Sequence, residues 1–226
     1  MIRRERSVPT DAAAAVTAPR NTPSQAELAA DLLPNQLVPV SGPPAELADK
    51  TVAGQVTEMG KARAIYDYVF NNMRYDKTGT GWGRGDTLFA CDLKRGNCTD
   101  FHSLFISMAR SQQIPSRFEI GFPIPADRHA GKIEGYHCWA DFYVPGRGWV
   151  PVDISEAWKH PAKRDYFFGS LDTNRVQFTI GRDLRLTPPQ AGPVLNYFVY
   201  PYVEMDSKPY TNVVNTFSFA DIHQAE

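Results

Sequence analysis

The feature that most constrains the fold is an amphipathic helix followed at once by a strand. Within residues 99–111, large apolar side chains recur at the spacing of one helix face, namely at Phe101, Leu104, Phe105 and Met108. Pro115 ends this helix, and residues 117–122 then alternate polar with apolar side chains as a strand does. The helix must bury its apolar face, and the nearest partner along the chain is a strand. A fold that mixes helices with a sheet follows.

The order of the other elements predicts an α+β domain. A second helical stripe lies upstream and ends before Tyr75. The segments downstream of residue 122 that fit strands are 136–144, 149–154, 175–180, 184–186, 196–205 and 213–219. Glycine-containing turns at residues 145–148 and 181–183 predict that the first four of these form two hairpins. Helices first and strands after them are typical of α+β folds.

Proline divides the chain near residue 45. Seven prolines lie within residues 1–44 and make this stretch poor in helix. We interpret residues 1–44 as a proline-rich arm, which is either disordered or lies on the domain through Leu32, Leu33, Leu37 and Val38. Residues 45–226 are predicted to form one catalytic domain.

Composition excludes several classes of protein. The 226 residues are 42% hydrophobic and 12% aromatic, which argues against a wholly disordered chain. The net charge of −1 argues against a nucleic-acid binder. No apolar run approaches the roughly 20 residues of a membrane span. Since the start also carries no signal-peptide core, the expected location is cytoplasmic, or periplasmic or secreted if the N-terminus is truncated. The sequence carries no signal for an oligomeric state.

Cys98 stands at the start of the first helix described, just after a turn that contains Gly96. The N-terminus of a helix carries partial positive charge, which stabilises a thiolate. Its free N–H groups can also hold the oxyanion that forms when a thiolate attacks an amide carbonyl. Taken alone, this segment fits a buried structural cysteine equally well.

His137 lies in the strand of residues 136–144, on the face that it shares with Trp139. Cys138 points to the other, apolar face and is interpreted as a core thiol. If Val144 pairs with Gly148, Trp139 stands opposite Asp153, so His137 and Asp153 lie on one face as diagonal neighbours. A loop longer by one residue places them on opposite faces.

Cysteine, histidine and aspartate in this order form a thiol-nucleophile constellation of nucleophile, base and orienter of the base. Trp139 would shield the hydrogen bond between His137 and Asp153 from water. Two stretches of the sequence carry a resemblance to a known family. They are RGNCTDFHSLFISMARSQQIPSRFEIGF at residues 95–122 and GYHCWADFYVPGRGWVPVD at residues 135–153. At these stretches the sequence resembles the transglutaminase-like superfamily, a branch of the papain-like thiol enzymes.

The resemblance implies that Cys98 is the nucleophile, His137 the base and Asp153 its orienter. It also implies a papain-like fold, in which a central helix carries the cysteine and packs on an antiparallel sheet. Members of this group often add a side-chain hydrogen-bond donor to the oxyanion hole. Trp82, in the glycine-rich loop of residues 79–85, is the candidate here. The Ile-Ser-Glu-Ala-Trp that follows Asp153 departs from the proline-containing turn of many members.

A zinc site is the main rival interpretation, because Cys98 and His102 are four residues apart on a helix and Cys91 lies nearby. The spacing from Cys91 to Cys98 is unusual for zinc, and no second pair completes the set. We therefore expect no metal and no cofactor. His102 is interpreted as a packing or supporting residue, and the glycine-rich loop at residues 79–85 as a rim of the cleft.

These observations predict a cysteine-dependent enzyme that cleaves or transfers amide or peptide acyl groups through a thioester, with hydrolysis favoured. A peptide or protein is the expected substrate. The alternatives are a protein-glutamine or small-molecule acyltransferase and a catalytically idle binding domain of the same fold.

Overall fold

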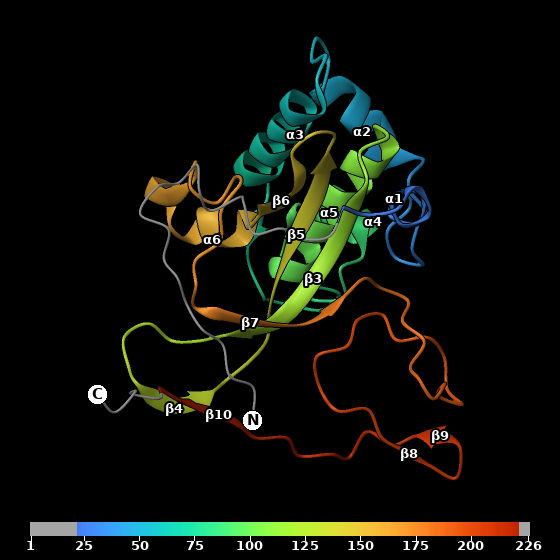
Figure 1. Ribbon diagram of the computed structural model, residues 1–226, viewed down its shortest axis with the longest axis vertical. Coiled ribbons are helices and arrows are strands. Elements are labelled where there is room, and N and C mark those ends of the chain that lie inside the picture. Colours follow the sequence, from blue (N-terminus) through green and yellow to red (C-terminus); the bar gives the residue numbers. More distant parts are fainter. Residues whose placement is uncertain (1–21, 222–226) are drawn as a thin grey trace. The chain divides into compact units, whose positions relative to one another are not determined.

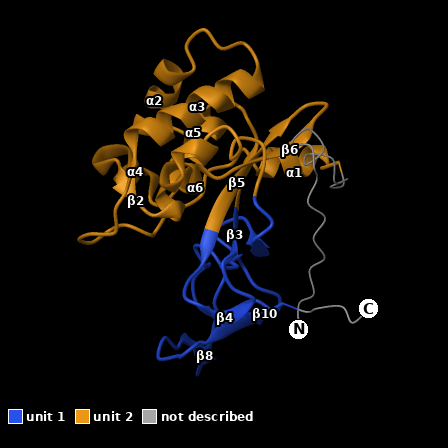
Figure 2. Ribbon diagram, turned by 90° about the vertical axis from the view of Figure 1, so that its left-hand side faces the viewer, with its two compact units in different colours: residues 1–5, 119–137, 172–226 blue, residues 6–118, 138–171 orange. Residues whose placement is uncertain are grey.

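The computed structural model describes residues 22–221, which divide into two compact units (Figure 2). Among these residues, unit 1 contains residues 119–137 and 172–221, and unit 2 contains residues 22–118 and 138–171. Residues 22–44 are part of unit 2, and the domain expected over residues 45–226 remains a prediction. Each unit is described by itself below.

Unit 2 holds the helices and the β-hairpin (Figure 1). Its helices are α1 (Gln25–Ala30), α2 (Pro43–Thr51), α3 (Glu58–Asn72), α4 (Thr87–Leu93), α5 (Cys98–Ser111), α6 (Ile154–Lys159) and the short 3-10 helix η2 (Pro161–Lys163). Its strands are β1 (Arg74–Tyr75), β2 (Arg95–Gly96), most of β5 (His137–Val144), β6 (Gly148–Val152) and the start of β3 (Ser116–Pro123).

Helix α5 is the centre of unit 2. It packs against α2, α3, α4 and α6, and in Figure 1 it lies among the first three. Every residue from Cys98 to Arg110 is buried, the polar ones included. The predicted apolar stripe therefore understated the burial of this helix, because its polar side chains also have partners inside the unit. Ser103 Oγ, for example, donates to Thr99 O at 2.7 Å.

The hairpin of β5 and β6 has the first of the two registers that the sequence left open. Val144 pairs with Gly148 and Ala140 with Val152, in antiparallel order. Gly148 has φ +87°, a conformation that glycine adopts without strain, and Arg147 N donates to Val144 O at 3.0 Å to close the loop. The strand order is β6-β5-β3-β7, and β3 begins in unit 2 and continues in unit 1.

Residues 22–44 lie against α5 through backbone and side-chain hydrogen bonds. Arg110 Nη1 donates to Leu33 O at 2.6 Å, and the Ser107 hydroxyl donates to Pro39 O. Val38 is fully buried, and Leu33 is 61% exposed. Residues 1–21, the remainder of the predicted arm, lie outside the described residues.

Unit 1 is built from short strands around a cluster of aromatic rings. Its strands are the end of β3, β4 (Ala130–Ile133), β7 (Arg175–Ile180), β8 (Glu204–Met205), β9 (Lys208–Pro209) and β10 (Phe217–Ala220). Strand β4 pairs with β10, β8 with β9 and β7 with β3, each antiparallel. The ring of Phe122 lies 4.9 Å from that of Phe178 and 4.5 Å from that of Phe217, and this cluster supplies apolar burial.

The second predicted hairpin is wrong. Residues 184–186 do not return along β7; Leu184 instead forms an isolated bridge with Leu195, and β7 pairs with β3. A turn signal identifies a change of direction but not the partner that follows. The α+β expectation is confirmed. Within residues 22–221, no helix has the length and apolar character that crossing a bilayer requires.

Candidate functional site

Cys98 is the first residue of α5 and is 2% exposed. Asn97 caps the helix: its side-chain oxygen accepts from Thr99 N at 2.9 Å, while the Asp100 carboxylate accepts from Asn97 N at 2.9 Å. This reciprocal capping box fixes the first turn and the backbone that carries the thiol. The positive end of the helix dipole therefore lies at Cys98, as the sequence predicted.

Asp100 also ties the glycine-rich loop to the helix. Its carboxylate accepts from Gly83 N at 2.7 Å and from Gly85 N at 3.0 Å, and the side chain is fully buried. Burial raises the pKa of Asp100, and the three backbone N–H donors only partly offset this rise. A Cβ at Gly96, where φ is +149°, would lie 2.2 Å from Asp100 Oδ2, so this turn requires glycine.

The thiol of Cys138 lies beside α5. Its Sγ is 3.8 Å from Thr99 Oγ1 and 3.8 Å from His102 Nδ1. Burial raises the pKa of Cys138 well above its usual value, and a hydrogen bond to Cys98 raises it further. Cys138 is buried as predicted, but its neighbours are polar groups of α5.

His102 connects α5 to the start of α6. The Ile154 backbone N–H donates to His102 Nε2 at 3.0 Å, so Nε2 is an acceptor and the proton of a neutral ring resides on Nδ1. His102 Nε2 is also 3.7 Å from Asp153 Oδ1, and both side chains are fully buried. His102 therefore supports the site, as the sequence analysis proposed.

Asp153 caps α6, and the residues that follow it form this helix instead of the proline-containing turn. Its Oδ1 accepts from Glu156 N at 3.0 Å and from Ser155 Oγ at 3.1 Å. Contacts within unit 2 thus lead from Cys98 through Cys138 and His102 to Asp153.

Tyr75 lies beside the turn that leads into α5. Strand β1 pairs with β2 in parallel, which sets Tyr75 opposite Gly96, and Asp76 N donates to Gly96 O at 3.0 Å. The Tyr75 ring is 6.1 Å from that of Phe101, and Lys159 Nζ lies 4.5 Å from its centre. Burial, followed by the negative charge of a Cys98 thiolate, raises the pKa of Tyr75 to about 12.

The remaining predicted residues have the following places. His137 is the first residue of β5 and is 6% exposed; it belongs to unit 1, and the next residue, Cys138, belongs to unit 2. Trp139 is buried in β5. The Trp82 indole N–H, which an oxyanion role requires, donates to Gly79 O at 3.1 Å within its own loop. The roles of these three side chains remain predictions.

Sequence reasoning missed the three-way anchoring by Asp100 and gave Tyr75 no chemical role. The capping-box spacing from Asn97 to Asp100 was the available signal for the first. A strand of two residues, such as β1, is too short to show periodicity. The sequence therefore contained no signal for the position of Tyr75.

Cys91, Cys98 and Cys138 are all free thiols. Across residues 22–221, no three His, Cys, Asp or Glu side chains are grouped so that they could hold a metal ion. The donor set of the zinc interpretation is thus not assembled in the described part of the chain.

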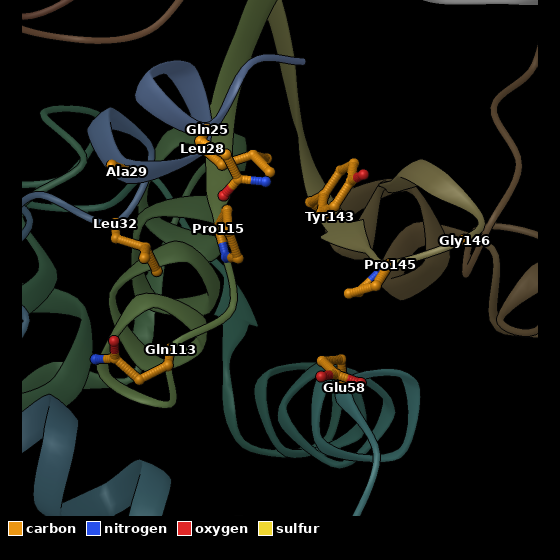
Figure 3. Close-up of a pocket in the computed structure, with 10 residues that line it drawn as sticks. All are labelled: Gln25, Leu28, Ala29, Leu32, Glu58, Gln113, Pro115, Tyr143, Pro145 and Gly146. Atoms are coloured by element: carbon orange, nitrogen blue, oxygen red, sulfur yellow. The ribbon is translucent and has the colours of Figure 1, made fainter. Parts of the chain in front are cut away.

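A cavity of about 410 Å³ lies elsewhere in unit 2 (Figure 3). Leu28 of α1, Glu58 at the start of α3 and Tyr143 near the end of β5 contribute to it, as does the loop between β5 and β6. None of its lining residues belongs to the group around Cys98, so this cavity is not part of the candidate site.

Comparison with known proteins identifies a related family. Residues 45–154 match the family model described as the Transglutaminase-like superfamily. Over 197 residues the chain is 32% identical to an uncharacterized protein of Haemophilus influenzae (strain ATCC 51907 / DSM 11121 / KW20 / Rd), covering 73% of this chain and 53% of that protein. Over 141 residues it is 27% identical to the uncharacterized protein YebA of Bacillus subtilis (strain 168), covering 56% of this chain and 19% of that protein.

A solved structure supports the fold. The crystal structure of a candidate cysteine protease from Cytophaga hutchinsonii aligns with a TM-score of 0.58 at 16% identity, covering 90% of this chain and 59% of that chain. At this identity the likeness concerns the fold alone. Together with the family match, it confirms the expected resemblance and the mixed fold of helices and antiparallel sheet.

Proposed function

Because residues 45–154 match the model of the transglutaminase-like superfamily, we propose that the chain is a cysteine-dependent enzyme that cleaves amide or peptide bonds through a thioester on Cys98. The observation that carries the proposal is the position of Cys98, which is the buried first residue of a helix whose first turn is fixed by Asn97 and Asp100. A peptide or protein is the proposed substrate.

His137 is the proposed base. It would take the thiol proton of Cys98, and the thiolate would attack the carbonyl carbon. His137 would then protonate the departing amine, which leaves an acyl group on Cys98 that water removes. Two observations support this role: His137 directly precedes Cys138, which makes a hydrogen bond with Cys98, and the hairpin register, with Ala140 opposite Val152, is the one that the proposed pairing of His137 with Asp153 requires.

Asp153 is the proposed orienter of His137. A carboxylate that is itself held by hydrogen bonds orients an imidazole better than a mobile one. Asp153 is fully buried and held by Glu156 N and Ser155 Oγ, which supports this role.

Selective alkylation tests the thiolate. Burial raises the pKa of Cys91 and, further, that of Cys138, so both are thiols at pH 6. We expect iodoacetamide at pH 6 to label Cys98 at least about tenfold faster than Cys91, as read by peptide mass spectrometry, because the thiolate is the reactive form.

The His137→Ala variant should lose this selective labelling, whereas Cys91→Ser should retain it. Labelling of all three cysteines only at high pH, unchanged by His137→Ala, contradicts the proposal.

Hydrolysis and acyl transfer are separated by one further incubation. A peptide library is treated with the protein with and without a primary amine, and products are identified by mass. Hydrolysis predicts the same cleaved products in both samples. Amine-linked products that appear only with the amine would assign the chain to acyl transfer instead, and no products in either sample would favour an idle binding domain.

A further inference from the structure

We propose that the Tyr75 hydroxyl donates a hydrogen bond to the oxyanion that forms on the substrate carbonyl when Cys98 attacks. The inference rests on the proposed function and adds a catalytic residue to it. All the residues that carry it lie in unit 2.

The backbone fixes Tyr75 next to the nucleophile. Tyr75 pairs with Gly96, two residues before Cys98, and the hydrogen bond from Asp76 N to Gly96 O holds the two strands together. On the far side, the ring of Trp158 lies 6.4 Å from the Tyr75 ring, and Lys159 Nζ lies 4.5 Å from its centre. The ring is therefore held between the start of α5 and the end of α6.

The hydroxyl of Tyr75 is available as a donor. The side chain is half-buried, and its hydroxyl makes no hydrogen bond with any residue in the range 22–221. The hydroxyl oxygen is not among the fully buried, unpartnered side-chain atoms of the described residues, so it remains accessible from solvent. Since the pKa of Tyr75 is raised to about 12, the hydroxyl keeps its proton at neutral pH, with a thiolate at Cys98 contributing to that rise.

Trp82, the donor suggested by the sequence, is less suited to this role. Its indole N–H already donates to Gly79 O at 3.1 Å, and an indole has no second donor. Recruiting Trp82 would break a bond inside the glycine loop, whereas recruiting Tyr75 breaks none.

An activated ester makes the attack of Cys98 on a carbonyl carbon measurable. With p-nitrophenyl acetate, the thiolate sulfur forms a bond to the carbonyl carbon, and the π electron pair of the C=O bond moves onto oxygen. The oxyanion then collapses, the C=O bond re-forms, and p-nitrophenolate leaves with the electron pair of the broken C–O bond. Acetyl-Cys98 remains, and water later hydrolyses it to acetate. Deacylation passes through a second oxyanion and returns the Cys98 thiolate, but the burst of p-nitrophenolate reports only the first oxyanion.

The test compares carbonyl attack with alkylation in the same proteins. Tyr75→Phe removes the hydroxyl and keeps the ring. We expect it to slow the p-nitrophenolate burst on the order of 10²-fold, because removing one oxyanion donor costs about that much. Iodoacetamide reacts with the thiolate by displacement at an sp³ carbon and forms no oxyanion, so its rate at Cys98 should change less than about twofold.

Tyr68→Phe is the matched control, because Tyr68 is also half-buried, and within residues 22–221 its hydroxyl has no hydrogen bond. It should leave both rates unchanged.

A burst that Tyr75→Phe slows less than about tenfold overturns the proposal, as does an equal loss of both rates, which would mean that Tyr75 acts on the thiol itself. A loss in Trp82→Phe in place of Tyr75→Phe assigns the donor to Trp82. If the wild type and Cys98→Ala release p-nitrophenolate alike, the proposed function itself fails.

Discussion

The Asp100 carboxylate accepts hydrogen bonds from three backbone N–H groups, those of Gly83, Gly85 and Asn97. Asp100→Asn replaces one carboxylate oxygen by an NH₂ group, which cannot accept. At least one buried N–H then loses its partner. We expect the free energy of unfolding at pH 7 to fall by about 2 kcal/mol, because an unsatisfied buried donor costs roughly 1–3 kcal/mol. Urea denaturation followed by circular dichroism measures this change.

Asp92→Asn is the control for that substitution, because Asp92 is exposed on α4 and should change stability by less than about 0.5 kcal/mol. Equal stability of Asp100→Asn and the wild type would show that the carboxylate does not hold the loop.

The same substitution has a pH dependence whose sign follows from burial. Burial raises the pKa of Asp100, so the folded state binds this proton more tightly than the unfolded state. The stability from this group is therefore fully present below the ordinary carboxyl pKa and is lost as pH rises through the raised value. The advantage of the wild type over Asp100→Asn should accordingly be larger near pH 4 than at pH 7. An advantage that grows with pH contradicts this sign.

The position of a single residue could be predicted where it depends only on residues nearby in the sequence. The place of Cys98 at a helix start follows from the Gly96 turn and the apolar stripe behind it. The neighbours of Cys138 could not be predicted, because Thr99 and His102 reach it only through the packing of α5 on β5. Strand alternation indicates which face a residue shares and says nothing of the side chains that meet that face.

Elements were predictable in proportion to their length. Helix α5 has strong periodicity and the β5–β6 hairpin has a glycine-bearing turn, so both were located, although the sequence left two registers open for the hairpin. Helices α1, α4 and α6 have six or seven residues, too few for a recurring apolar face. Their stability comes from caps and from packing, as with Asp153 at the start of α6.

The joint between α5 and α6 depends on one buried imidazole. His102→Phe keeps a ring of similar size but removes the acceptor of the Ile154 N–H. We expect a loss of about 2 kcal/mol in the free energy of unfolding. His102→Gln places an amide oxygen near the position of Nε2 and should recover part of the loss. If the two variants are equally stable in urea, the hydrogen bond to Ile154 does not contribute.

At the scale of the whole molecule, the division into two units was not predictable from sequence. Unit 1 is assembled from residues 119–137 and 172–221, which are far apart along the chain. The sequence shows that strands occur in both stretches, but only tertiary packing determines that β4 pairs with β10. A boundary argued from proline content marks where the composition changes and not where the contacts divide.

The two units should differ in local stability. In unit 1, β4–β10 and β8–β9 are two-stranded pairs, and such pairs are marginally stable in water. In unit 2, α5 is buried along nearly its whole length. Backbone amides of β4 and β10 should therefore exchange with deuterium at least about 100-fold faster than those of α5, which corresponds to a difference of roughly 2.8 kcal/mol in opening free energy. Hydrogen exchange read by mass spectrometry on the intact chain measures both sets at once, with the intrinsic rate of each peptide as the reference. Equal protection in the two units would mean that they open together as one cooperative structure. Exchange in α5 that is faster than in β4 would contradict the assignment of α5 as the stable centre that holds Cys98.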